Sequence, residues 1–219
     1  MTSGQPARRP SRGGRPPMRV LLPLLALVVA SGLAGALALA RAGDGGSDPA
    51  RTGAGPVLHA PATAGRDADG APVRLPSPDG RPAMVTFLFT ECPDVCPLVA
   101  SRIAAALDAA GPAAGGIDVV AISVDPPGDT PAAVRAFLDR HGLRGRMRYM
   151  VGSRAELEPV WRAWGVAAQT DDRSGGHRES VHSAPIVFID GDGRQVARYA
   201  AGAPYSPADL AREIRLLTA

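Results

Sequence analysis

The two cysteines of this 219-residue chain are the residues best suited to chemistry. Cys92 and Cys96 are its only cysteines, and three residues separate them. They follow an apolar, strand-like run over residues 83–89 and precede a helix-like run over residues 98–110. Two thiols this close can act on one electrophile, one disulfide partner or one soft metal ion, because thiolates select Cu(I) or zinc over hard cations. An inert disulfide is the simplest alternative.

Pro97 follows Cys96 directly and constrains this corner of the chain. Proline has no N–H and disfavours a helical conformation in the residue before it, so we expect the helix to begin no earlier than Pro97 and the cysteines to lie on a turn. A helix N-terminus stabilises thiolates, whereas the charge of Asp94 opposes this effect. We therefore expect reactive, moderately perturbed thiolates here.

Four histidines are candidates for a third metal ligand. His182 is placed best, because it comes three residues before a predicted strand that starts near Pro185, and that turn is expected beside the cysteine corner. His177, in a glycine-containing loop, is weaker. His141 precedes a helix-ending glycine and is expected to cap a helix dipole, and His59 is uninformative. Two sulfurs and one imidazole suit copper, and zinc with an added water is chemically allowed.

The elements around the cysteines follow a β-α-β-α-β-α-β-β-α order. Strands are predicted over residues 83–89, 117–124, 147–151, 186–189 and 195–200, with helices between the first four and after the last. Nearly continuous apolar strands joined by helices predict a parallel sheet covered on both faces. With a closing hairpin, this is a thioredoxin-like α/β fold, a central mixed sheet flanked by helices, whose chemistry lies at the carboxyl ends of its parallel strands.

Other side chains in these elements are expected to have structural roles. Asp125 and Asp129 suggest a hard-metal site, but a turn and a helix cap explain them better. Trp161 and Trp164 are expected to pack a helix with a partly exposed edge. Pro185 occupies the place where thioredoxins keep a cis-proline.

The first 57 residues are expected to tether the domain to a membrane. Residues 1–17 are expected to form a disordered, basic cytoplasmic segment, 18–41 a transmembrane anchor, 42–57 a flexible stalk, and 58–219 the folded domain. At about 1.5 Å per residue, the apolar run within 18–41 can cross a hydrocarbon core of about 30 Å. The arginines ahead of it place the domain on the extracytoplasmic face of the cell membrane, as a single-pass protein. A cleaved signal peptide is the alternative.

The basic charge of the chain belongs to this N-terminal region. All 24 basic side chains are arginine, and six lie at or before Arg41, so the remaining 18 face 21 acidic residues. The mildly acidic remainder excludes the electrostatic footprint of a nucleic-acid-binding protein. In an oxidising compartment, a thiol reductant or a metal must keep the cysteine pair from forming a disulfide.

Residues 87–97 (FLFTECPDVCP) resemble the cysteine motif of the Sco/SenC family of copper-binding thioredoxin-like proteins. Residues 122–126 and 129–131, and the His182-containing segment, follow in that family's order. The resemblance implies a copper metallochaperone for cytochrome c oxidase assembly, more a carrier than an enzyme. It implies Cu(I) or Cu(II) bound by Cys92, Cys96 and His182, and a partner in the CuA site of oxidase subunit II, to which copper or electrons are passed.

Two positions depart from that family. Val181 stands where the family has an aspartate before the histidine, so a carboxylate that would orient the ligand is missing. Pro185 is more typical of a thioredoxin. The alternative function is therefore an extracytoplasmic thiol–disulfide oxidoreductase that uses Cys92 and Cys96 without metal. A one-cysteine peroxidase is a weaker third option.

Overall fold

The computed structural model describes residues 58–166, 184–200 and 203–219. In chain order the elements are β1 (Leu58–His59), β2 (Thr63–Asp67), β3 (Pro72–Leu75), β4 (Ala83–Leu88), α2 (Val95–Ala110), the 3-10 helix η2 (Gly111–Gly116), β5 (Asp118–Ser123), α3 (Pro131–Arg140), β6 (Arg148–Val151), α4 (Arg154–Trp164), β7 (Ile186–Ile189), β8 (Arg194–Tyr199) and α5 (Pro207–Leu217). From β4 onward, strands and helices follow the predicted order, which is confirmed.

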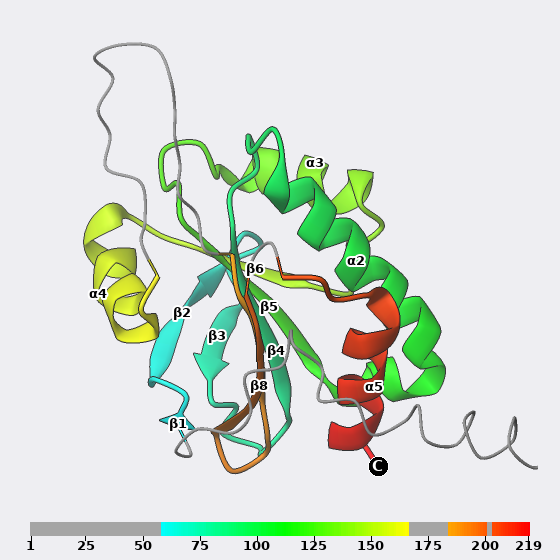
Figure 1. Cartoon of the computed structure of the whole chain (residues 1–219). Helices are drawn as coiled ribbons and strands as arrows, with labels where there is room; N and C mark the ends of the chain where they lie inside the picture. Colours follow the sequence, from blue (N-terminus) through cyan, green and yellow to red (C-terminus); the bar gives the residue numbers. More distant parts are fainter. Residues whose placement is uncertain (1–57, 167–183, 201–202) are drawn as a thin grey trace, which may run out of the picture. The chain divides into compact units, whose positions relative to one another are not determined.

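The strands form one mixed sheet in the order β1-β8-β7-β4-β5-β6-β2-β3 (Figure 1). β4, β5 and β6 run parallel, while β7 is antiparallel to β4. The β4–β5 ladder ends where Leu88 pairs with Ser123, and Val187 of β7 pairs with Val85. The carboxyl ends of β4 and β5 and the amino end of β7 therefore meet at the end of the sheet where the cysteine loop leaves β4.

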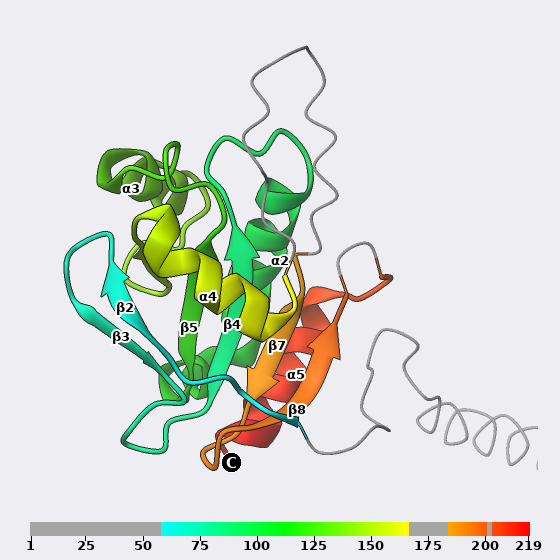
Figure 2. The ribbon, with the colours of Figure 1, turned by 90° about the vertical axis from the view of Figure 1, so that its left-hand side faces the viewer.

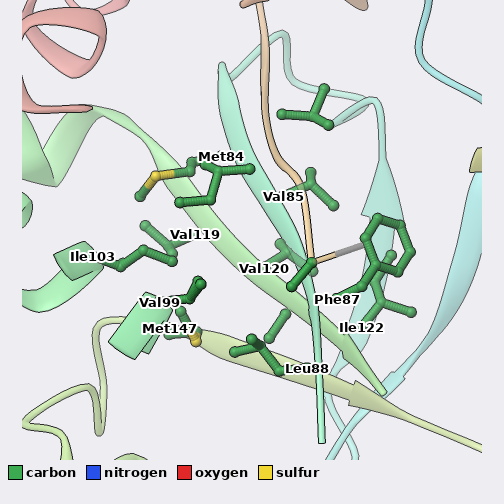
Figure 3. Packing of buried hydrophobic residues seen from close by; sticks show 14 of the residues in the cluster. Met84, Val85, Phe87, Leu88, Val99, Ile103, Val119, Val120, Ile122 and Met147 are labelled. Carbon is green, nitrogen blue, oxygen red and sulfur yellow. The ribbon is translucent and has the colours of Figure 1, made fainter. Parts of the chain in front are cut away.

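The central strand β4 is buried along its whole length. Its side chains alternate between the two faces of the sheet: Met84 lies towards Ile103 of α2, while Phe87 lies on the opposite side (Figure 3). The Phe87 ring meets the Trp164 ring of α4 edge-on, with 5.8 Å between centroids. Helices on both faces explain why this strand is apolar at nearly every position.

The helices lie on both sides of the sheet, and α3 and α4 begin at side-chain caps. α4 lies on one face, and α2 and α5 lie on the other (Figure 2). α4 starts with a capping box between Ser153 and Glu156 and ends at Gly165, whose φ of 64° is left-handed. Thr130 caps α3 by accepting a hydrogen bond from the Ala133 amide.

The sequence did not predict strand β2 or the burial of its tryptophan neighbour. β2 pairs antiparallel with both β3 and β6, and so extends the sheet at its edge. Thr63 of β2 accepts a hydrogen bond from Nε1 of Trp164 at 2.8 Å. Trp161 and Trp164 are each 3% exposed, so the expected partly exposed edge is wrong.

Within the described part of the chain, no helix is long and apolar enough to cross a membrane. The predicted anchor over residues 18–41, with the flanking segments 1–17 and 42–57, lies outside the described residues.

Candidate metal centre

The two cysteines lie together where the chain passes from β4 into α2. Cys92 is in the connecting loop, and Cys96 is the second residue of α2. The Cys96 amide donates a hydrogen bond to Sγ of Cys92, with 3.3 Å between nitrogen and sulfur. Both are free thiols, and they are 7% and 1% exposed. The two cysteines are thus held at one buried corner by this hydrogen bond, without a disulfide between them.

Helix α2 begins earlier than the sequence predicts. It starts at Val95, so the expectation that no helix forms before Pro97 is wrong, and Cys96 is helical. A proline in the first turn removes no helical hydrogen bond, because the first N–H groups have no partner within the helix. Asp94 precedes the helix but makes no side-chain capping bond. The Cys92 sulfur serves as the acceptor there instead.

The thiol of Cys96 departs from the expected reactive thiolate. Burial raises its pKa well above the ordinary value, and the Cys92 thiol and the charge of Asp129 add to this effect. Removal of the thiolate from water therefore outweighs the favourable end of the α2 dipole. The raised pKa favours the protonated thiol of Cys96 at neutral pH, so metal binding to its sulfur would release a proton.

Asp129 is a buried carboxylate that is hydrogen-bonded to the loop between β4 and α2. One oxygen, Oδ1, accepts a hydrogen bond from the Thr90 amide at 2.7 Å. The other, Oδ2, accepts from Oγ of Ser123 at 2.6 Å and from the hydroxyl of Tyr149 at 3.1 Å. Burial raises the pKa of Asp129, while these hydrogen bonds oppose the shift. The expected helix-cap role is wrong, because Thr130 caps α3.

The end of β5 is fixed beside this carboxylate. Trp161 of α4 donates its indole N–H to the Ser123 carbonyl at 2.8 Å. Tyr149 of β6 is fully buried, and burial followed by the Asp129 charge raises the pKa of its hydroxyl. Sequence reasoning missed this group, although a tyrosine in a short, mostly apolar strand was a signal that its hydroxyl needs a buried partner.

Neither described histidine forms a metal-binding group with the two cysteines. His59 is exposed on β1 and pairs with Arg194 in the sheet. His141 ends α3 as expected, with its ring 4.6 Å from that of Phe137 and its Nδ1 3.4 Å from Oγ of Ser101. Burial and then Arg140 lower its pKa, which favours the neutral ring.

His182 and His177 lie outside the described residues. The chain is described again from Ala184, just ahead of β7. The expectation of a cis-proline at Pro185 is wrong, since the one cis peptide bond in the described ranges is Leu75–Pro76. Among the same residues, no three histidine, cysteine, aspartate or glutamate side chains are grouped closely enough to hold a metal ion.

The mixed sheet and the thiol pair at a strand-to-helix corner define a thioredoxin-like protein. A sequence model of the SCO1/SenC family matches residues 64–219. The chain therefore belongs to the SCO1/SenC family.

Individual relatives agree with this assignment over parts of their length. Protein SenC of Rhodobacter capsulatus is 32% identical over 84 residues, which cover 38% of this chain and 37% of SenC. The mitochondrial SCO1 homolog 1 of Arabidopsis thaliana is 33% identical over 116 residues, which cover 48% of this chain and 34% of the relative. The chain thus spans little more than a third of either protein.

The fold is also similar to a solved structure. That structure is Bradyrhizobium japonicum ScoI with copper bound, which aligns with a TM-score of 0.63 at 29% identity. The alignment covers 73% of this chain and 99% of that protein.

Proposed function

We propose that this chain carries copper on Cys92, Cys96 and His182 and serves the assembly of cytochrome c oxidase. The observation that supports this most directly is the pair of free, buried thiols whose residues are joined by the bond from the Cys96 amide to the Cys92 sulfur. Two soft donors at one corner suit Cu(I), and an imidazole would complete a three-coordinate site. The similar Bradyrhizobium protein was solved with copper bound.

The position of β7 supports His182 as the third ligand. β7 runs antiparallel to β4, so the chain enters it at the same end of the sheet where β4 leads into the cysteine loop. Ala184 is buried at that entry, two residues after His182. Two residues span at most about 7 Å, so a ligand at position 182 would be bound close to the start of β7 in this proposal.

The remaining parts of the proposal follow from the family resemblance and the N-terminal sequence. The recipient is the CuA site of oxidase subunit II. An anchor within residues 18–41 holds the domain on the extracytoplasmic side of the cell membrane. A thiol reductant keeps Cys92 and Cys96 open for metal.

Copper titration of the reduced full-length protein tests the ligand set. The unaltered chain is expected to bind about one copper ion per molecule, since two thiolates and one imidazole make a single soft site. Cys92→Ser and Cys96→Ser should abolish tight binding, and His182→Ala should weaken it. His59→Ala is the matched control and should bind as the unaltered chain does. Undiminished binding in both cysteine variants would refute the proposal.

The free cysteine pair also supports a second candidate, a thiol–disulfide oxidoreductase. One thiolate would attack a partner disulfide, and the other would then displace the reduced partner, leaving a Cys92–Cys96 disulfide to be reduced again by an external thiol. The raised pKa of Cys96 makes that residue a poor attacking group. Disulfide reduction that persists in His182→Ala but is lost in Cys92→Ser would favour this function over copper transfer.

A further inference from the structure

We infer that Asp129 is a positioning residue for the cysteine loop, which it holds by binding the Thr90 amide. This inference concerns the site of the proposed function, but it rests on contacts that exist without copper. Asp129 is 3% exposed, and Thr90 comes two residues before Cys92. The 2.7 Å bond from the Thr90 amide to Oδ1 is the contact that carries the argument.

The Thr90 amide needs this partner because the sheet ends before it. The last bonds between the two central strands include that from the Val124 amide to the Leu88 carbonyl. Beyond this point, the β4 and β5 segments separate. The Cys92 amide turns back to the Phe89 carbonyl at 3.4 Å, so Thr90 lies inside a tight turn that ends at the cysteine. Fixing the backbone of Thr90 therefore fixes the backbone position of Cys92.

Asp129 can act as a fixed support because its other oxygen is held independently. Oδ2 accepts from Ser123 of β5 and Tyr149 of β6, and the Asp129 amide donates to the Asp125 carbonyl at 2.9 Å. The carboxylate is thus tied to two strands of the sheet and to its own loop. A buried carboxylate is costly unless hydrogen bonds satisfy it, so this one is bound tightly in a single orientation.

Because Oδ1 and Oδ2 of Asp129 have different partners, the contact to Thr90 can be altered separately from the others. Asp129→Ala removes the acceptor for Thr90. Asp129→Asn keeps an amide oxygen for Thr90, while its NH₂ group can donate to the Ser123 and Tyr149 hydroxyls. Tyr149→Phe removes one donor to Oδ2 and leaves the Thr90 bond and the Ser123 bond in place.

The test measures the reaction of Cys92 with a small maleimide in the reduced full-length protein, with Cys96→Ser as the background so that one thiol is read. Asp129→Ala should speed the reaction by about tenfold or more, the change expected when a hydrogen bond to a charged group is lost. Asp129→Asn should react at nearly the unaltered rate. Tyr149→Phe should lower stability but leave the rate unchanged.

Equal acceleration by Asp129→Ala and Tyr149→Phe, or none by Asp129→Ala, would overturn the inference. Because Asp129→Ala can fail to fold, hydrogen exchange of the Thr90 amide in the unaltered chain gives a second measurement. Slow exchange is expected, and exchange as fast as in an open loop would also overturn the inference. Neither experiment uses copper, so the positioning role stands or falls separately from the proposed function.

Discussion

The charged side chains at the two ends of the parallel strands differ in burial and in their partners. At the amino ends, a cavity of about 530 Å³ is lined by five arginines, Arg81, Arg135, Arg144, Arg146 and Arg148. Each forms an ion pair with an aspartate, and the side chains of most of these pairs are substantially exposed. At the carboxyl ends, the carboxylate of Asp129 is buried, and its three hydrogen-bond donors are all neutral.

This difference shows that the number of charges in a region does not measure how much they contribute to the free energy of folding. Exposed ion pairs are typically worth about 0–1 kcal/mol each and weaken in salt. Breaking a buried, hydrogen-bonded group costs more, because its former partners are left without one. The end with the buried carboxylate is therefore the one where single substitutions should matter most, and it is also the end that holds the cysteines.

Trp161→Ala should have the largest effect. It removes a buried indole, 3% exposed, together with its hydrogen bond to the Ser123 carbonyl at the cysteine end. We expect the free energy of unfolding, from urea denaturation, to fall by about 3–5 kcal/mol. Arg162→Ala, at the exposed neighbouring position, is the control and should change little. A loss no larger than that of the control would contradict the comparison.

Asp129→Asn should change how stability depends on pH. The pKa of Asp129 is raised by burial above its ordinary value of 3.8. Below 3.8 the carboxyl is protonated in both the folded and the unfolded chain; as pH rises through the folded pKa, the unfolded chain ionises first and folding stability is lost. Urea denaturation at several pH values from acid to neutral should therefore show that the stability of Asp129→Asn rises relative to that of the unaltered chain as pH increases.

Asp139→Asn serves as the opposite case at the arginine end. A hydrogen bond from Arg144 lowers the pKa of Asp139. Its contribution is present above the ordinary value and is lost as pH falls through the lowered pKa. At neutral pH and low ionic strength, where the exposed Asp139 pair is not screened, the two variants should thus deviate from the unaltered chain in opposite directions. Deviation in the same direction would refute this account.

Asp118→Asn should have a moderate effect. Asp118 is the exception among the arginine-end carboxylates, because two arginines share it: Arg81 and Arg148 each approach one of its oxygens to 3.2 Å. Its side chain is 20% exposed. Urea denaturation should show a loss of about 1 kcal/mol at low ionic strength, which shrinks in high salt. A loss that salt does not alter would argue against an electrostatic origin.

Arg144→Ala should have the smallest effect. Arg144 pairs with Asp139 at 2.8 Å, and both side chains are largely exposed. The midpoint of thermal unfolding should stay unchanged at physiological salt, because water and ions replace the partner. A clear drop in the midpoint would show that the arginine end supports the fold more than its exposure implies.

Local signals in the sequence predicted most of the fold. The apolar run of β4, the Ser153–Glu156 capping box and the proline after Thr130 each act over a few residues, so the sequence displays them directly. β2 was missed because Thr63–Asp67 shows no apolar alternation, and it is a strand because it pairs with β3 and β6.

The candidate site was only partly predictable for the same reason. The short spacing of Cys92 and Cys96 is itself enough to put both at one corner of the fold. The Asp129 bond to Thr90 spans 39 residues, and no local pattern signals it. The burial that raises the pKa of Cys96 also arises from distant segments, whereas the helix N-terminus, which is local, suggested the opposite shift.

The bond from the Cys96 amide to the Cys92 sulfur makes one atom serve two purposes. Any oxidation, alkylation or coordination that engages this sulfur draws electron density from the acceptor that closes the first turn of α2. The chemical state of the thiol is therefore transmitted to the backbone of helix α2. The NMR frequency of a single amide, that of Cys96, should report that state without any label on the sulfur itself.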